Sequence, residues 1–293
     1  MMTEMHQVSR TAQYMALFRA IESGKPVGHR LFHDTMAKAF LDRRLRFAST
    51  VARIPLIGCT IPWILDTAWP GARTSGVART RFIDDRLKQA MQEGFRQVII
   101  LGAGFDTRAY RMKELAEVSV IEVDQPATSR LKRSTLGRLL GELPSNVRFL
   151  EMDFNNQRLE AGINSLDFDP ATPTAVIWEG VTNYLTAEGV EATFRSLGRI
   201  ARRCRVMVTY IDRAVLDSGV HFAGAANAKA RIASVGENWT FGFNPVEFPV
   251  YLARYGFHLL EDVGSREYRA LYMPARRRVL RGYEWYRIGV VEK

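Results

Sequence analysis

Acidic side chains follow several strand-like runs of this sequence, at positions where α/β proteins often hold their ligands. Because the carboxyl ends of parallel strands meet at one edge of a sheet, residues after different strands can converge on one site. Four successive runs end in or just before an acid. These acids are Asp106, Glu122, Asp124, Asp153 and Glu179. Such a ring would accept hydrogen bonds from hydroxyl and amino groups and would repel phosphates.

Residues 97–108, QVIILGAGFDTR, predict a strand, a tight turn and a helix start. Gly102 and Gly104 would let the backbone approach a ligand closely, because glycine lacks a Cβ and tolerates positive φ. A dinucleotide fingerprint needs a third glycine, and Thr107 stands in its place. Together with the acids, this pattern favours S-adenosylmethionine, which has ribose hydroxyls, an adenine amine and two positive centres but no phosphate.

Each acid has a binding interpretation and some have a structural one. Glu122 or Asp124, at the end of the second strand, could accept both ribose hydroxyls. Asp153 could accept from the adenine amine, or it could cap the next turn. Glu179 follows a strand that reads as fully buried, where an unpaired carboxylate would be costly.

Strand-like and helical patterns alternate after residue 94, which favours a mostly parallel sheet covered by helices on both faces. Helical patterns separate several of the strands, at 107–115, 125–140 and 186–202. The expected strands are 98–101, 119–123, 147–150, 175–178, 205–211, 258–263 and 287–291. The first of them lacks polar alternation and is typical of a strand buried on both faces.

The first 94 residues read as mostly helical, packed on the core domain. Two arginines of the last helix, Arg79 and Arg81, could supply the one cation that the cofactor's carboxylate requires. The helical patterns cover 9–22, 34–47 and 77–92.

Residues 95–293 would form the cofactor-binding α/β domain, and the whole chain would form one compact domain. An insertion rich in Ala, Gly and aromatic residues covers about 212–250, before the last strands. Two interpretations stay open for it: a lid over a substrate pocket, or a plain packing insert.

The composition excludes several classes. At 293 residues, with 47% hydrophobic and 25% charged residues, it is that of a globular protein. The longest apolar region, 54–69, is interrupted by two prolines, a glycine and an aspartate, so no membrane span is expected. The N-terminus lacks the pattern of a secretory signal. We expect a cytoplasmic protein without a membrane partner, and no oligomeric state is indicated.

The formal net charge is +10, from 41 basic and 31 acidic residues. It is compatible with an anionic partner. The arginines of 276–281 are better explained as a solvated face than as a nucleic-acid site, because no RNA-binding signature accompanies them. Cys59 and Cys204 have no metal-binding spacing, so we expect reduced core cysteines and no metal site.

Six segments of the chain resemble the leucine carboxyl methyltransferase family, including its bacterial O-methyltransferase branch and the methyltransferases of tetracenomycin-type polyketide acids. LGAGFDTR and EGVTNYL together carry most of the resemblance. The six run in the family's order over roughly the first two-thirds of the chain. They are SRTAQYMALFRAIE at 9–22, GVARTRFIDDRL at 76–87, VIILGAGFDTRAYR at 98–111, VIEVDQP at 120–126, VRFLEMDF at 147–154 and WEGVTNYL at 178–185.

The resemblance implies a class I methyltransferase fold, Rossmann-like, and S-adenosylmethionine as cofactor. Arg79 would hold the methionine carboxylate, with Arg19 of the N-terminal helix as a second candidate. Gly104 and Asp106 belong to the same expected site. The remaining implied contacts are Gly102 at the cofactor backbone, Asp124 at the ribose, Asp153 with Phe154 at the adenine, and Glu179 beside the cofactor.

Methyl transfer from a sulfonium is an in-line displacement, so the protein must align acceptor, methyl group and sulfur. A carboxylate acceptor is already ionised and needs no general base. A phenol or alcohol would need one. His221, in the insertion, is the first candidate, ahead of the histidines at 29, 33 and 258. Tyr184, in EGVTNYL, could orient the acceptor through its hydroxyl or simply pack.

We therefore expect an S-adenosylmethionine-dependent O-methyltransferase that acts on a small organic acceptor, first a carboxylate, in specialised metabolism. Phenolic O-methylation in aromatic polyketide tailoring is the alternative within enzymes. A cofactor-binding module without catalysis is an alternative of another class. An NAD-linked oxidoreductase is disfavoured by the missing third glycine.

Overall fold

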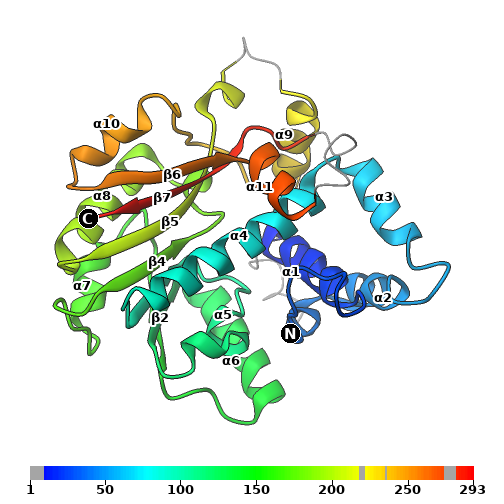
Figure 1. Ribbon diagram of the computed structural model, residues 1–293, viewed down its shortest axis with the longest axis horizontal. Helices are drawn as coiled ribbons and strands as arrows, with labels where there is room; N and C mark the ends of the chain where they lie inside the picture. The colour runs from blue at the N-terminus through cyan, green and yellow to red at the C-terminus, as the bar shows by residue number, and fades with distance from the viewer. Residues whose placement is uncertain (1–9, 218–221, 235, 274–281) are drawn as a thin grey trace.

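The computed structural model describes residues 10–217, 222–234, 236–273 and 282–293. A seven-stranded sheet forms its centre, with strand order β3-β2-β1-β4-β5-β7-β6 (Figure 1). All seven expected strands are confirmed, each within one residue at its ends. They are β1 (Gln97–Leu101), β2 (Ser119–Asp124), β3 (Val147–Glu151), β4 (Thr174–Trp178), β5 (Cys204–Ile211), β6 (His258–Gly264) and β7 (Tyr286–Glu292).

Strands β1 to β5 are parallel, and β7 lies antiparallel between β5 and β6. The chain moves outward from β1 to β2 and β3, then returns to place β4 on the other side of β1. The strand order therefore reverses between β1 and β4. In open α/β sheets, ligands bind outside the carboxyl ends of the strands at such a point.

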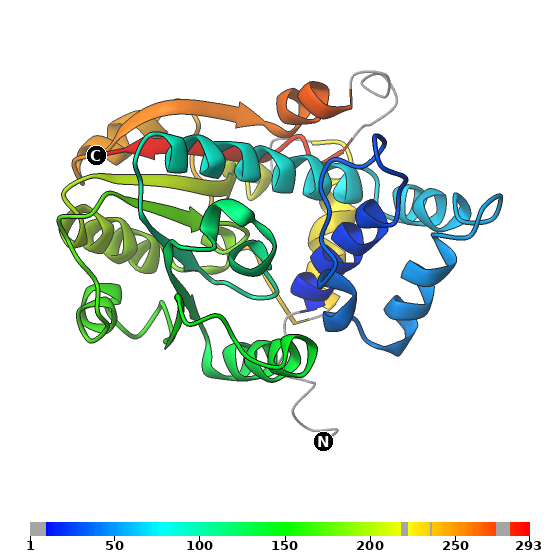
Figure 2. The same ribbon diagram turned by 60° about the horizontal axis from the view of Figure 1, so that its bottom comes forward.

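Helices cover both faces of the sheet, as expected (Figures 1 and 2). Ile99 and Leu101 of β1 point to one face, and Val98 and Ile100 point to the other, because side chains alternate along a strand. The first face packs against α7 (Leu159–Asn164), α8 (Ala187–Ile200) and α10 (Phe248–Ala253). The second packs against α4 (Ala72–Gln92), α5 (Arg108–Arg111) and α11 (Ser265–Tyr272).

The N-terminal region is helical, but the prediction of a single second helix over 34–47 is wrong. The chain instead forms a short 3-10 turn, η2 (Ala37–Phe40), and then α2 (Arg43–Val51). Asp34 does not enter a helix, because its carboxylate accepts the backbone N–H groups of Met36 and Ala37. Asp42 then begins α2 as its N-cap. The flanking helices are α1 (Arg10–Ser23) and α3 (Thr60–Ala68).

Other helix boundaries also differ. α4 begins at Ala72, five residues before the expected start, and Gly76 inside it lets α1 approach. A Cβ on Gly76 would lie 2.9 Å from Met15 Cε. The expected helix 107–115 divides into α5 and η3 (Lys113–Leu115). α6 (Pro126–Leu140) and α8 lie where helices were expected at 125–140 and 186–202.

The expected insertion at 212–250 lies between β5 and β6. It contains η5 (Arg213–Val215) and α9 (Ala225–Ser234), and its last residues begin α10 on the sheet. Cys204 is buried, whereas the expectation that Cys59 is a core residue is wrong, because Cys59 is exposed before α3. No helix in the described ranges has both the length and the apolar character to cross a membrane.

Candidate active site

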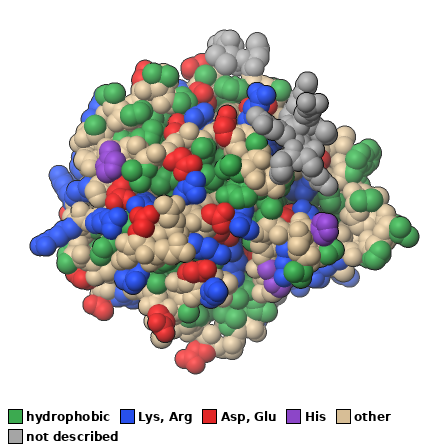
Figure 3. All heavy atoms as spheres, viewed as in Figure 1, with side chains coloured by type: hydrophobic (Ala, Val, Ile, Leu, Met, Phe, Trp, Pro, Cys, Tyr) green, Lys and Arg blue, Asp and Glu red, His purple; other side chains and the backbone are tan. Residues whose placement is uncertain are grey.

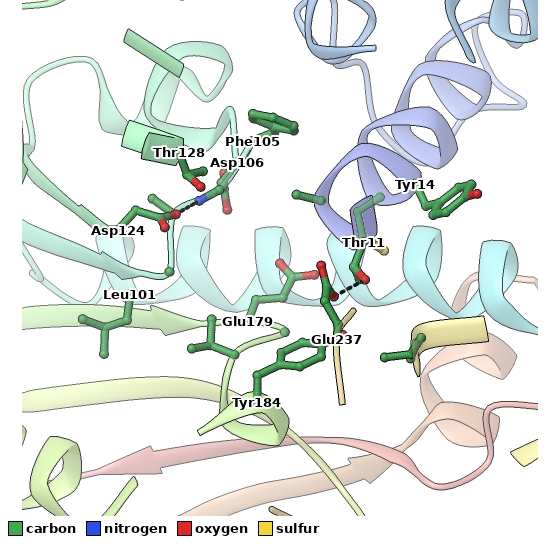
Figure 4. Close-up of a pocket in the computed structure, with 18 of the residues that line it drawn as sticks. Thr11, Tyr14, Leu101, Phe105, Asp106, Asp124, Thr128, Glu179, Tyr184 and Glu237 are labelled. Atoms are coloured by element: carbon green, nitrogen blue, oxygen red, sulfur yellow. Dashed lines mark hydrogen bonds between the residues drawn. The ribbon is translucent and has the colours of Figure 1, made fainter. Parts of the chain in front are cut away.

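A cavity of about 580 Å³ opens at the carboxyl ends of the central strands (Figure 4). Its walls come from α1, from the N-terminal part of α4 with the residues before it, from the loops after β1 to β4, from the insertion and from the start of β7. Of the site residues expected from the sequence, ten line it: Arg19, Arg79, Gly102, Gly104, Asp106, Asp124, Asp153, Phe154, Glu179 and Tyr184. His221 lies outside the described residues.

The turn after β1 forms the floor of the cavity. Gly102 has φ +63° and Gly104 has φ +41°, the left-handed region that glycine adopts most easily. The Gly104 N–H donates to the Asp124 carboxylate, which also accepts from Gln125 N at 2.6 Å. Burial raises the pKa of Asp124, although these two hydrogen bonds oppose the shift.

Glu122 and Asp124, the two acids of β2, face different surroundings. Only Asp124 lines the cavity. Glu122 is buried with Lys132 of α6, whose Nζ lies 2.9 Å from its carboxylate. Burial raises the pKa of Glu122 to about 7, although the Lys132 ammonium opposes the shift. The geometry thus separates a cavity acid from a buried structural acid.

Glu179, after β4, is held by two guanidinium groups. Arg79 of α4 donates from Nε to one carboxylate oxygen, and Arg108 of α5 donates from Nη1 to the other, each at 2.8 Å. Burial disfavours the ionised form of Glu179, but the two arginines outweigh it and lower its pKa. The carboxylate that seemed costly from the sequence is therefore paired and charged.

Arg108 extends the same network to Asp106 and Asp84. Its Nε donates to Asp84 at 2.7 Å, and its Nη1 bonds Asp106. Despite burial, which acts in the opposite direction, Arg108 and Lys132 hold the pKa of Asp106 at about 2. Sequence reasoning missed the role of Arg108, although it lies in the GFDTR segment.

Arg19 borders the cavity while two of its donors are engaged elsewhere. Its Nε donates to Asp34 at 2.9 Å, and its Nη2 donates to the Phe105 carbonyl. Thr107, at the place of a third glycine, also donates to Asp34, at 2.7 Å. Arg19 thus supports the turn after β1. Arg81, the alternative to Arg79, pairs with Asp85 and is not a lining residue.

Asp153 and Phe154 lie beyond β3 at the same end of the cavity. The Asp153 carboxylate accepts from Asn155 N at 2.9 Å and from Asn156 Nδ2 at 2.6 Å, so it also shapes its own turn. Phe154 is part of the core beneath. Both the binding and the structural interpretation of Asp153 therefore fit the geometry.

Aromatic side chains enclose the opposite side of the cavity. Neighbouring rings pack against one another. The ring centroids of Tyr14 and Trp69 lie 5.3 Å apart in an edge-on arrangement, and those of Trp69 and Tyr283 lie 6.2 Å apart. Arg79 stacks over Tyr286 at 4.6 Å. Together these aromatic residues are called the aromatic wall, and they are Tyr14, Trp69, Tyr184, Trp239, Tyr283 and Tyr286.

One further acid, Glu237, enters the cavity beside the aromatic wall. It follows α9 in the insertion and accepts from Thr11 Oγ1 of α1 at 2.5 Å (Figure 4). Burial, followed by the nearby charge of Glu237, raises the pKa of Tyr184. No sequence pattern points to Glu237, because it lies in an irregular segment.

The candidate general-base histidines that lie within the described residues are not part of the cavity. His29, His33 and His258 are exposed and do not line it. In the described ranges, no group of three or more His, Cys, Asp or Glu residues has the arrangement of a metal site.

The model of the leucine carboxyl methyltransferase family matches residues 12–198. The chain belongs to this family. A Mycobacterium tuberculosis protein, provisionally named as an S-adenosyl-L-methionine-dependent methyltransferase, is 31% identical over 79% of this chain and 64% of its own length. A Parafrankia protein with the same kind of name is 36% identical over 66% of this chain and 60% of its own. The chain thus spans less than two thirds of these relatives.

A crystal structure from Thermobifida fusca, provisionally described as a methyltransferase, has the same fold. The two chains superpose with a TM-score of 0.59 at 17% identity, over 94% of each. The family match and this superposition confirm the expected resemblance and the class I methyltransferase fold. The relatives' names agree with the predicted cofactor, S-adenosylmethionine.

Proposed function

We propose that this chain is an S-adenosylmethionine-dependent O-methyltransferase acting on a small organic molecule. The observation that carries the proposal is the cavity itself, in which acids from four strand ends face an aromatic wall. Carboxylates suit the hydroxyls, amine and ammonium of this cofactor, and they oppose a pyrophosphate. When bound, the cofactor supplies a methyl group activated by its sulfonium.

We assign the cofactor to the side of the cavity formed by the turn after β1. Asp124 would accept from the ribose, and Asp153 with Phe154 would meet the adenine. Arg79 would hold the methionine carboxylate, because its guanidinium borders the cavity. The cofactor site also includes Gly102, Gly104, Asp106 and Glu179. Arg19 supports this site through its hydrogen bond to the Phe105 carbonyl.

The acceptor would lie against the aromatic wall, where it faces Tyr184. A carboxylate is the first candidate for the acceptor, because it reaches the site ionised and requires no base. That choice agrees with the absence of a described histidine from the cavity lining. Tyr184 would then orient the acceptor by hydrogen bonding, since burial keeps its hydroxyl protonated.

A phenolic acceptor is the second candidate, favoured by Glu237. Its carboxylate would repel an anionic acceptor but could accept the proton of a hydroxyl group. The flat, apolar faces of the aromatic wall suit an aromatic acceptor, as in polyketide tailoring.

The test is single-turnover methyl transfer from isotope-labelled cofactor to matched carboxylic and phenolic acceptors. A methyl product that mild base hydrolyses supports the carboxylate acceptor, and a base-stable product supports the phenol. If the cofactor binds but no labelled methyl group is transferred to any acceptor, the chain would be a non-catalytic module. A thermal shift with NAD and none with S-adenosylmethionine would refute the cofactor.

A further inference from the structure

Six large apolar side chains are exposed together on the α2–α3 hairpin, residues 43–68. Leu56 is 95% exposed, Phe47 71% and Trp63 67%. Exposed apolar residues are usually scattered singly, and a cluster marks an interaction surface. Figure 3 shows hydrophobic side chains at the end of the molecule where Figure 1 draws α3. The six are Phe47, Ile54, Leu56, Ile57, Trp63 and Ile64.

The hairpin does not need these residues to pack on the protein. Its inner side chains, Leu45, Ala52, Ile61 and Leu65, already join the core around α1. α3 nevertheless contains no fully buried residue. A helix with apolar residues on every side is normally enclosed. The outer apolar face therefore exceeds what folding of this region requires.

The tip of the hairpin holds a leucine in a costly backbone conformation. Leu56 has φ +70°, which is unfavourable for a side chain of its size. The Ile57 N–H donates to the Pro55 carbonyl at 2.9 Å, so Leu56 is the centre of a three-residue turn. Such strain is commonly retained where a residue has a function. Here it projects the most exposed leucine outward.

The same hairpin is basic. Arg43 lies one helical turn before Phe47, and Arg53 precedes Ile54. Within the part of the chain that the structure describes, these arginines and their neighbours Arg44 and Arg46 form no ion pair. Asp66 of the hairpin is paired with Arg73, and Asp42, which caps α2, is paired with Arg10.

The combination of charge and apolar surface discriminates between occupants. In a symmetric dimer each patch faces its own copy, so the arginines would oppose one another. An anionic lipid surface attracts arginine and accepts Trp, Leu and Ile at the boundary of its headgroups. We propose that the α2–α3 hairpin docks on anionic lipid bilayers, with Leu56, Ile57 and Trp63 inserted at the interface.

The sequence predicted no membrane partner because it lacks a spanning segment, and peripheral docking needs none. Trp69 follows α3 directly and belongs to the aromatic wall. Docking would therefore bring the acceptor side of the cavity close to lipid. A lipophilic acceptor entering from the bilayer is a consequence that rests on the proposed function, whereas docking itself does not.

Vesicle co-sedimentation of the full chain tests the proposal, using equimolar phosphatidylglycerol and phosphatidylcholine or phosphatidylcholine alone. We expect the protein to bind the anionic vesicles at least about tenfold more tightly. A variant combining Leu56→Ser, Ile57→Ser and Trp63→Ser should lose at least about tenfold in binding. A matched control, Val246→Ser, Val250→Ser and Leu271→Ser, changes exposed aliphatic residues elsewhere and should bind as the wild type does.

A second pair of variants keeps the test independent of folding in the first. Replacing Arg43, Arg44 and Arg53 by glutamine should remove the preference for anionic vesicles. Subtracting the fluorescence spectrum of Trp63→Phe from that of the wild type gives the emission of Trp63. This emission should shift to shorter wavelength when vesicles are added.

Three results would overturn the proposal: failure of the wild type to bind either vesicle, hairpin variants that bind unchanged, or an unshifted Trp63 spectrum. Light scattering that shows a dimer lost in the hairpin variant would assign the surface to a second copy instead.

Discussion

Arg108 controls several acids of the site through a single side chain. It reaches Asp84, Asp106 and Glu179 at once, and its side chain is only 3% exposed. A guanidinium presents several donors in a fixed plane, whereas an ammonium is a compact point charge. The positions of two of the cavity acids, Asp106 and Glu179, therefore depend on this arginine as well as on their strands.

Arg108→Lys should keep the charge and lose the shared geometry. We expect the free energy of unfolding to fall by about 3 kcal/mol, because a buried ionic network is broken. The dissociation constant for S-adenosylmethionine should rise about tenfold or more, a loss of about 1.4 kcal/mol. Urea unfolding and calorimetric titration measure the two effects.

Arg111→Lys is the matched control, because Arg111 pairs with Asp84 at 2.8 Å but bonds neither cavity acid. It should lose stability and retain cofactor affinity. Equal losses of affinity in the two variants would contradict the role given to Arg108.

Glu122 predicts a distinct dependence of stability on pH. Burial raises its pKa from 4.5 in the unfolded chain to about 7 in the fold. Between these values the folded protein binds more protons than the unfolded chain, so this group's stabilisation is complete below pH 4.5 and declines as pH rises toward 7. Glu122→Gln cannot titrate and should remove a decline on the order of 3 kcal/mol. Parallel curves of unfolding free energy against pH for both proteins would refute this.

At the scale of elements, the turn after β1 and the loop after β4 fit each other only if residue 102 is glycine. A Cβ on Gly102 would lie 2.2 Å from Val181 Cγ2. Gly102→Ala should therefore separate the two segments that border the cofactor. We expect a loss of about 2 kcal/mol in unfolding free energy and a weaker cofactor complex, measured by thermal unfolding and titration.

Gly94→Ala supplies the control for that variant. Gly94, after α4, has φ +92° but nothing within 4 Å of the added Cβ. The free energy of unfolding of this variant should fall by about 1 kcal/mol, the cost of a left-handed backbone at alanine, and the variant should bind the cofactor normally. Similar cofactor affinities for both variants would show that the contact with Val181 is unimportant.

The strands were predictable from the sequence because burial on both faces leaves a plain signal. Val98 to Leu101 form an uninterrupted apolar run, and the acids after such runs mark the strand ends. The helix expected over 34–47 failed for the opposite reason. Its local pattern was helical, but Asp34 is fixed by Arg19 and Thr107, which lie elsewhere in the sequence. Local periodicity contains no information about such contacts.

The cofactor side of the site was likewise more predictable than the acceptor side. Gly102, Asp124 and Glu179 lie next to strands that the sequence pattern predicts. Arg108 and Glu237 gain their places only through partners distant along the chain. The acceptor side is built from irregular segments, and the sequence pattern of such segments does not specify where they fold.

At the scale of the whole molecule, the cavity joins four parts of the chain: α1, the start of α4, the sheet's carboxyl edge and the insertion. Thr11 and Glu237 are 226 residues apart, yet their side chains meet at the cavity. The insertion therefore does more than pack on the sheet, because it contributes Glu237 and Trp239 to the lining. An acceptor bound there would be enclosed by both ends of this contact.

Glu237→Gln should separate the two proposed acceptors. With a phenol, loss of the carboxylate should lower kcat/KM about 100-fold, the range of general base catalysis, and leave cofactor affinity unchanged. With a carboxylic acid, kcat/KM should stay the same or rise, because a like charge is removed. Thr11→Val breaks the contact with α1 but keeps the carboxylate, so an equal loss in that variant would assign Glu237 to closure rather than to proton transfer. Glu247→Gln, an exposed acid of the same insertion that does not line the cavity, should change neither acceptor's rate.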